Sequence, residues 1–192
     1  MQTEKVAAYF DHLALEWDTL HRHDESKIER ILDYADIKHN LSVLDVGCGT
    51  GVLFPFYLKR EISSLTGVDL SSGMIAQAKE KFQDPRIHLT VGDVERLQLD
   101  TYDRCVVYSA LPHFKDAAKL IEKLSLALEP DGRLTVAHSE SREAIDQRHK
   151  GSARDVSVGL MPATELAMLF SPFFHVDFVI DDDIYVVSGK KI

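Results

Sequence analysis

The stretch Val43-Leu44-Asp45-Val46-Gly47-Cys48-Gly49-Thr50-Gly51 decides the fold of this chain. It begins as a short apolar, β-branched run and ends in three glycines at alternate positions. Glycine allows a sharp turn and lets a ligand lie directly on the backbone. The stretch therefore predicts a strand, a tight loop and a helix whose N-terminus offers unpaired N–H groups to an anionic group. The G-x-G-x-G spacing is one residue shorter than in dinucleotide sites, so we expect a group smaller than a pyrophosphate, such as a carboxylate.

Strand-like and helix-like segments alternate after that stretch. Near-continuous apolar runs, typical of strands covered on both faces, occupy residues 65–68, 87–91, 105–108 and 134–137. Helical patterns lie between them at residues 52–59, 73–82 and 117–128, and Glu129-Pro130-Asp131-Gly132 predicts a turn. This alternation predicts an α/β fold: a doubly wound, Rossmann-like, mostly parallel sheet between two layers of helices.

The two ends of the chain depart from this rhythm. Apolar residues recur at helical spacing from Val6 to Trp17 and again from Ile28 to Leu32, which predicts two helices joined by the polar turn 21–24. After a short helix at 163–170, the runs 174–180 and 184–188 flank the acidic turn 181–183. Strands joined so tightly must be antiparallel, so we expect an antiparallel strand at the end of the sheet.

Composition narrows the class of protein. The 192 residues fit one domain, and the 45% share of hydrophobic residues is ordinary for a globular chain. The net charge of −9, with no offsetting basic run, disfavours a nucleic-acid partner. Two cysteines without a C-x-x-C pair give no zinc or disulfide signal. No signal core or membrane-length apolar run is present, so we expect a cytoplasmic protein with no membrane segment.

Two acids follow the next two strands. Asp69 ends the second strand 18 residues after Gly51, a position that suits the two hydroxyls of a ribose. Asp93 follows the third strand and is placed to reach an adenine edge. The carboxyl ends of adjacent parallel strands form the usual ligand-binding edge of an open α/β sheet, so the glycine loop and both acids should face one ligand.

Four stretches together resemble the successive motifs of class I S-adenosylmethionine-dependent methyltransferases of the small-molecule type. They are residues 45–51, Gly67-Val68-Asp69-Leu70-Ser71, Gly92-Asp93-Val94 and Leu128-Glu129-Pro130-Asp131-Gly132-Arg133-Leu134. The resemblance covers residues 41–137. It implies a seven-stranded sheet whose last strand is antiparallel. Residues 9–11 and 17–18 resemble the cap helix that closes over the cofactor in such enzymes.

The resemblance also implies a cofactor site. Asp45 would sit near the methionine amino group, with the glycine loop against its backbone; Asp69 would hold the ribose, and Leu70 and Met74 the nucleoside. Asp93 and Val94 would meet the adenine. The full predicted set is Asp45, Gly47, Cys48, Gly49, Gly51, Asp69, Leu70, Met74, Asp93, Val94 and Tyr108. We divide a single domain, 1–192, into a helical cap (1–40), a cofactor-binding core (41–137) and an acceptor-side segment (138–192).

Histidines gather where the acceptor should lie, after the fourth and fifth strands. His113, His138 and His149 are candidate catalytic residues. They could act as general bases, coordinate a metal or simply satisfy backbone groups. The third interpretation is favoured for any one histidine, and a substrate-site role for the cluster; we predict no resident metal. Phe10, Trp17 and Arg142 are candidate acceptor contacts, with core packing as the alternative for the aromatic residues and a surface ion pair for Arg142.

These observations predict an enzyme that transfers the methyl group of S-adenosylmethionine to a small-molecule acceptor, leaving S-adenosylhomocysteine. A base is needed only where the acceptor carries a proton. We expect a monomer or homodimer. Two alternatives belong to other classes: a non-catalytic S-adenosylmethionine-binding sensor or partner subunit, and an NAD-dependent oxidoreductase, which the short glycine spacing disfavours.

Overall fold

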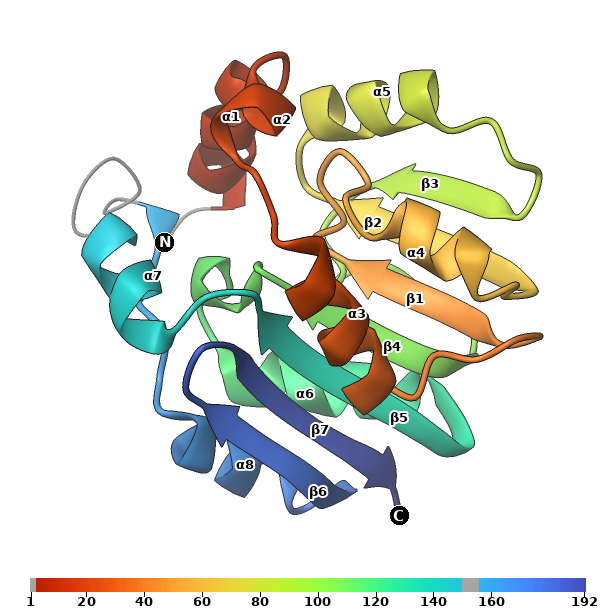
Figure 1. The fold of residues 1–192 in the computed structure, drawn as a ribbon, viewed down its shortest axis with the longest axis vertical. Helices are drawn as coiled ribbons and strands as arrows, with labels where there is room; N and C mark the ends of the chain where they lie inside the picture. Colours follow the sequence, from red (N-terminus) through yellow and green to blue (C-terminus); the bar gives the residue numbers. More distant parts are fainter. Residues whose placement is uncertain (1–2, 150–155) are drawn as a thin grey trace.

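A seven-stranded sheet forms the centre of the computed structural model, which describes residues 3–149 and 156–192, without the side chains of residues 148 and 149 (Figure 1). The strands lie in the order β3-β2-β1-β4-β5-β7-β6. Their bounds are β1 (Ser42–Val46), β2 (Ser64–Asp69), β3 (Ile87–Val91), β4 (Tyr102–Tyr108), β5 (Leu128–His138), β6 (Phe174–Asp181) and β7 (Tyr185–Lys191). The helices are α1 (Thr3–Leu13), α2 (Trp17–Leu20), α3 (Glu25–Tyr34), α4 (Phe54–Lys59), α5 (Ser72–Lys81), α6 (Ala117–Leu126), α7 (Arg142–His149) and α8 (Ala163–Phe170), with a 3₁₀ turn η1 (Leu111–His113).

The strand directions confirm the predicted fold class. The pairs β1–β2, β1–β4, β2–β3 and β4–β5 are parallel, whereas β7 runs antiparallel to both β5 and β6. The chain therefore ends in a reversed strand, as the acidic turn predicts. That strand lies between β5 and β6, so β6 forms the outer edge of the sheet.

Apolar residues cover both faces of the sheet. On one face, Leu120 and Leu124 of α6 and Phe170 of α8 pack against alternate strand residues such as Leu44 and Val107. The opposite face carries α3, α4 and α5, whose buried residues Ile31, Phe54 and Ile75 pack with Val43, Leu65 and Val106. Because successive side chains of a strand point to opposite faces, each apolar run supplies both layers. The three-layer α/β/α arrangement follows from this.

Three local expectations were wrong. Strand β3 is not covered on both faces, because it is the outer strand and exposes Val91. The turn predicted at residues 129–132 lies inside β5, as an irregularity where Leu128 pairs with Tyr102 and Arg133 with Arg104. Asp131 adopts φ 65° there, a left-handed conformation that explains why a glycine would suit the position. The first helix also breaks after Leu13, which lets Phe10 and Trp17 meet edge to face at 5.5 Å between ring centroids.

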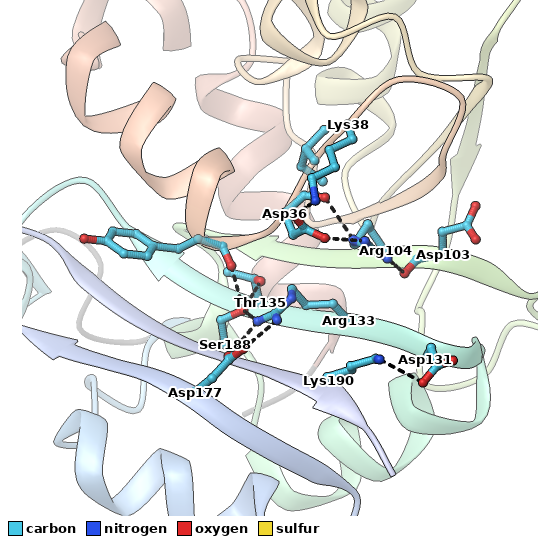
Figure 2. A network of polar contacts seen from close by, with 12 residues as sticks. Asp36, Lys38, Asp103, Arg104, Asp131, Arg133, Thr135, Asp177, Ser188 and Lys190 are labelled. Carbon is cyan, nitrogen blue, oxygen red and sulfur yellow. Dashed lines mark hydrogen bonds and ion pairs between the residues drawn. The ribbon is translucent and has the colours of Figure 1, made fainter.

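A network of ion pairs holds the other end of the sheet, away from the glycine loop (Figure 2). The guanidinium of Arg133 donates to both carboxylate oxygens of Asp177 at 2.7 and 2.6 Å and to Oγ of Ser188 at 2.9 Å. The Ser188 hydroxyl donates in turn to the carbonyl of Tyr34 on α3. The Arg133 side chain is only 11% exposed, so this bidentate pair ties β5, β6 and β7 to a helix of one layer.

We expect the substitution Arg133→Met to lower the free energy of unfolding by about 2 kcal/mol, because it leaves the Asp177 carboxylate without its hydrogen-bond donors. Urea unfolding monitored by circular dichroism measures this. The matched control is Arg96→Met, since the Arg96 side chain is 82% exposed and makes one ion pair with Asp93. A surface substitution of that kind should stay within about 0.5 kcal/mol of wild type. Equal losses in both variants would contradict the structural role of Arg133.

Candidate functional site

A pocket lies at the carboxyl edge of the parallel strands, beneath α1 and α2. It encloses about 810 Å³ of space, its mouth included. Its walls come from α1 and α2, which are called the cap from here on, and from the loops that follow β1, β2, β3 and β4. The lining residues are Val6, Phe10, Trp17, His23, Val46, Gly47, Cys48, Gly49, Thr50, Val52, Val68, Asp69, Leu70, Met74, Gly92, Val94, Tyr108, Ser109, Ala110, His113 and Phe114. This is the edge at which open α/β sheets bind ligands.

The glycine loop after β1 forms the floor of the pocket. Gly47, Gly49 and Gly51 all have positive φ, at 69°, 55° and 86°. A Cβ atom on Gly47 would lie 2.6 Å from Cβ of Ala110, whereas one on Gly49 would meet nothing within 4 Å. Gly47 is therefore required for close packing against the loop after β4. Gly49 leaves open space above the backbone.

Three amides of the glycine loop are hydrogen-bonded to the end of β2. The N–H groups of Gly47 and Cys48 donate to the carbonyl of Val68, and the N–H of Gly49 donates to Oδ2 of Asp69 at 2.9 Å. These three amides precede α4, whose N-terminus the sequence predicts to offer unpaired N–H groups, so that expectation stays a prediction. The second carboxylate oxygen of Asp69 accepts from the Ser71 amide at 2.8 Å. Asp69 thus fixes the glycine loop and lines the pocket at the same time.

Asp45, which is buried, and Asp69, which is half-buried, are neighbouring carboxyls in this part of the molecule. Burial, and then the nearby Asp69, raise the pKa of Asp45 to about 8. Burial also raises the pKa of Asp69, against the opposing hydrogen bonds from the Ser71 and Gly49 amides. Both shifts show that negative charge is poorly solvated here. A cation placed beside these carboxyls would relieve that penalty, so the site favours a positively charged ligand.

Two aspartates of the cap fasten it over the pocket. Oδ1 of Asp11 accepts from the Ser71 hydroxyl at 2.6 Å and from the Gly73 amide at 2.8 Å, at the N-terminus of α5. Asp18 accepts from the Thr50 hydroxyl at 2.5 Å and from the Lys81 ammonium at 2.6 Å. The cap is therefore bonded directly to the glycine loop and to the helix that follows Asp69. Its closure and the shape of the pocket depend on each other.

Aromatic rings and imidazoles form the far end of the pocket, after β4. The ring of Phe10 meets that of His113 edge to face, at 4.9 Å between centroids. Nδ1 of His113 lies 2.8 Å from the carbonyl of Val156, which can only accept, so this nitrogen carries the proton. Ser109 has φ 53°, an uncommon conformation for a residue with a side chain. Strained backbone of this kind clusters at functional sites.

The structure brings together most of the predicted site residues but not all. Those that line the pocket are Gly47, Cys48, Gly49, Asp69, Leu70, Met74, Val94, Tyr108, Phe10, Trp17 and His113. Those that lie outside its lining are Asp45, Gly51, Asp93, His138 and Arg142. The buried Asp45 lies within β1, and Asp93 accepts from the Glu95 amide and pairs with Arg96. The side chain of His149 lies outside the described residues.

The remaining acceptor-side predictions have local partners. His138, at the end of β5, is 3% exposed and meets the ring of Tyr185 edge to face. Arg142 pairs with Asp181 at 3.3 Å and with Asp146 at 3.7 Å, which matches the ion-pair alternative. Within residues 3–149 and 156–192, no three His, Cys, Asp or Glu side chains gather in a way that could hold a metal ion. In the same ranges, no helix is long and apolar enough to cross a membrane.

Sequence reasoning missed His23 as a pocket residue. It lies in the polar turn between α2 and α3, which the sequence marks only as a break in the apolar pattern. The position of that turn could have indicated a pocket residue. The turn joins the cap to the core, so it must cross the ligand-binding edge of the sheet. Ser109, Ala110 and Phe114 were also missed, although they directly follow the predicted fourth strand.

Comparison with known proteins agrees with this geometry. The family described as "Methyltransferase domain" matches residues 43–132. The chain is 38% identical over 96 residues to a malonyl-[acyl-carrier protein] O-methyltransferase of Priestia megaterium, covering 49% of this chain and 35% of that protein. It is 30% identical over 130 residues to the enzyme of the same name from Acetivibrio thermocellus, covering 66% and 46%. The chain thus spans less than half the length of these two relatives.

These findings support a class I S-adenosylmethionine-dependent methyltransferase. The resemblance found in the sequence motifs is therefore confirmed. A chain in the complex between the Haloferax volcanii Trm112 methyltransferase activator and a methyltransferase has the same fold, with a TM-score of 0.80 at 18% identity, covering 95% of this methyltransferase chain and 97% of that one. That likeness supports the fold.

The pocket fits the cofactor of this family. S-adenosylmethionine carries a positive sulfonium and an ammonium group, and a positive charge nearby would stabilise the ionised forms of Asp45 and Asp69, whose pKa values are raised. The open space above Gly49 provides room for a group that lies on the backbone. The apolar walls formed by Leu70, Met74 and Val94 suit a nucleoside base.

We expect Gly47→Ala to destabilise the fold more than Gly49→Ala. Both substitutions force a left-handed conformation on alanine, at about 1 kcal/mol. The Gly47 variant adds the clash with Cβ of Ala110, for a total of about 3 kcal/mol. Urea unfolding of the two variants measures the difference. Equal unfolding free energies would show that the approach of the two loops is not constrained by Gly47.

The hydrogen bonds that Asp11 accepts from Ser71 and Gly73 should weaken at acid pH. The Ser71 hydroxyl, and then the Gly73 amide, lower the pKa of Asp11 below its ordinary 3.8. A lowered pKa contributes stability that is present above the unfolded pKa and lost as pH falls through the folded pKa. We therefore expect the difference in unfolding free energy between wild type and Asp11→Asn to shrink as pH falls below about 4. Emission of Trp17, the one tryptophan of the chain, monitors the cap.

The control for this pH series is Asp100→Asn, since Asp100 is an exposed residue of the loop before β4. Its difference from wild type should stay flat over the same range. A difference for Asp11→Asn that stays flat, or grows toward acid pH, would show that the carboxylate does not fasten the cap.

Proposed function

We propose that this protein transfers the methyl group of S-adenosylmethionine to a small-molecule acceptor and releases S-adenosylhomocysteine. The observation that carries the proposal is the glycine loop bound to Asp69 at the edge of a pocket that a cap closes. The match to the methyltransferase family and the names of the relatives support methyl transfer. The two relatives named above are malonyl-[acyl-carrier protein] O-methyltransferases.

The proposed cofactor contacts follow from the pocket walls. Asp69 would accept hydrogen bonds from the ribose hydroxyls, because its carboxylate lines the pocket while holding Gly49. Gly47, Cys48 and Gly49 would support the amino-acid part of the cofactor. Leu70, Met74 and Val94 would enclose the adenine. Asp45 and Asp93 would act from behind this lining, Asp45 through its charge and Asp93 through the loop that carries Val94.

The bound cofactor would supply an activated methyl group on a good leaving group. The protein then has to position the acceptor, exclude water and accept a proton where the acceptor carries one. Phe10 and Trp17 of the cap would shield the reacting atoms, since both rings line the pocket. Of the two predicted catalytic histidines whose side chains the structure describes, His113 lines the pocket and His138 does not. His138, His149 and Arg142 stay predictions for an acceptor that extends toward α7.

We also propose that the protein acts in the cytoplasm, as a monomer or homodimer. Burial of both free thiols, Cys48 and Cys105, raises their pKa values and suits a reducing compartment without disulfides. The net charge of −9 supports an acceptor other than nucleic acid.

Isothermal titration calorimetry with S-adenosylmethionine tests the proposal. We expect binding by the wild type and an affinity at least about 10-fold lower for Asp69→Asn, because a charge-assisted hydrogen bond contributes about 1.5–3 kcal/mol. The control Asp100→Asn should bind like the wild type. No binding heat at high protein concentration would contradict the proposal. Binding without S-adenosylhomocysteine formation over a broad acceptor panel would favour a sensor or partner subunit instead.

A further inference from the structure

Three side chains from separate parts of the chain form a hydrogen-bonded series beside the pocket, where β4 and β5 end. Nδ1 of His23 lies 2.8 Å from the hydroxyl oxygen of Tyr108. The Tyr108 hydroxyl donates to Oγ of Ser139 at 2.7 Å. His23 comes from the turn between the cap and α3, Tyr108 ends β4, and Ser139 follows β5. Tyr108 and Ser139 are buried, at 4% and 8% exposure, while His23 and Tyr108 line the pocket.

The direction of these bonds fixes the position of a proton on His23. A tyrosine hydroxyl has one hydrogen, and that of Tyr108 is given to Ser139. The hydroxyl oxygen must therefore accept from His23, so Nδ1 carries the imidazole proton. Burial raises the pKa of Tyr108 to about 12, so the hydroxyl stays protonated at neutral pH and keeps this direction. In neutral His23 the lone pair then resides on Nε2.

We propose that His23 is the general base of the methyl transfer and that Tyr108 and Ser139 are positioning residues that hold it in the Nδ1–H tautomer. This inference rests on the proposed function. A carboxylate or carbonyl usually orients a catalytic histidine; here a buried hydroxyl pair does so. Because His23 lies directly after the cap, this base is in place when the cap is closed, so proton acceptance is tied to closure.

The walls of the pocket point to the acceptor class. Within the described part of the lining, Asp69 is the one carboxylate, and it lies at the cofactor end, bonded to Gly49. The acceptor end presents Phe10, Trp17 and Phe114 together with neutral hydrogen-bonding groups. No carboxylate, lysine or arginine is among the described residues that line this end, so a cationic amine or an anionic carboxylate would lose its hydration there without an ion-pair partner in the lining. A neutral hydroxyl on an apolar, ring-sized body, such as a phenol, fits these walls.

The proton and the electrons balance in such a transfer. A lone pair of the acceptor oxygen forms the new oxygen–carbon bond while the carbon–sulfur bond breaks and its electron pair stays on sulfur. The hydroxyl proton passes to Nε2 of His23, and the resulting imidazolium returns it to water after the ether product leaves. Asp18 of α2, Asp24 of the same turn and Glu140 beyond β5 are the charged groups that act on His23 or Tyr108.

His113 is the competing base, since it also lines the pocket with a protonated Nδ1. Its Nδ1–H donates to the carbonyl of Val156 and so ties η1 to the segment before α8. We assign it to the wall of the acceptor site. If His23 is the base, His23→Gln should lose activity and His113→Gln should largely keep it. If His113 is the base, the reverse should hold.

Nitrogen-15 NMR of the histidine side chains in the cofactor-free protein tests the tautomer without any activity measurement. We expect His23 to give the Nδ1–H pattern in the wild type and to lose it in Tyr108→Phe, which has no hydroxyl to accept the bond. Ser139→Ala should weaken the preference of His23 for the Nδ1–H tautomer, and Ser139→Thr, which keeps a hydroxyl, should preserve that preference. The His175→Gln variant removes an exposed histidine of β6. It should leave the signals of His23 unchanged and so serves as the assignment control. An Nε2–H pattern in the wild type, or no change in Tyr108→Phe, would overturn the proposal.

Methylation of a graded series of phenols tests the role in catalysis. We expect His23→Gln to lose about 100-fold or more in kcat on phenols that are neutral at the assay pH, with little change in KM. On 4-nitrophenol, already ionised in mildly alkaline buffer, the variant should approach wild-type rates. Conversely, equal losses on all phenols, a loss in His113→Gln alone, or a wild type that methylates none of them would refute it.

Calorimetry with S-adenosylmethionine distinguishes a failure of the proposed base from a failure of the proposed function. Binding by both wild type and His23→Gln together with a negative phenol result would refute the base assignment and leave the cofactor site intact. Absence of binding by the wild type would refute the proposed function itself. His175→Gln should match the wild type in both assays.

Discussion

The carboxylate of Asp69 is the contact on which the rest of the site depends. One of its oxygens holds the amide of Gly49 and the other holds the amide of Ser71, so the glycine loop and the start of α5 are fixed to the end of β2. The glycines can follow this path because all three adopt positive φ. The same carboxylate lines the pocket. Structural and ligand-binding roles are therefore combined in one side chain.

Closure of the pocket builds on this clamp. Asp11 bonds to Ser71 and Gly73, immediately after the segment that Asp69 fixes, and Asp18 bonds to Thr50 within the glycine loop. The cap is thus anchored to elements whose positions are already set. His23, which follows the cap, reaches Tyr108 as a consequence of that anchoring. Cofactor binding, closure and placement of the proposed base form one connected arrangement.

Local sequence patterns predicted the elements better than they predicted side-chain partners. The apolar run before Gly47 and the acidic turn after β6 gave the parallel core and the reversed last strand, because period and turn length are properties of short segments. Exposure of β3 depends on strand order, which no local pattern encodes. The bulge at Asp131 was read as a turn because a left-handed residue beside proline and glycine looks the same in sequence.

The residues of the candidate site also fall into those that local sequence predicts and those that it does not. Glycines and acids at strand ends have a fixed relation to the edge of the sheet, so Gly47, Gly49 and Asp69 were found from spacing. Arg142 and His138 also follow a strand, yet they have partners at Asp181 and Tyr185, outside the lining of the pocket. His23 was missed because its partners, Tyr108 and Ser139, lie 85 and 116 residues away along the chain. Only the folded structure brings these three together.

The most direct measurement of the central claim is a crystal structure of the protein with S-adenosylhomocysteine. We expect density for the ligand across the glycine loop, with its ribose hydroxyls on the Asp69 carboxylate and its sulfur facing the end of β4. Crystals grown at saturating ligand in which side chains cover the glycines and no density lies beside Asp69 would contradict it.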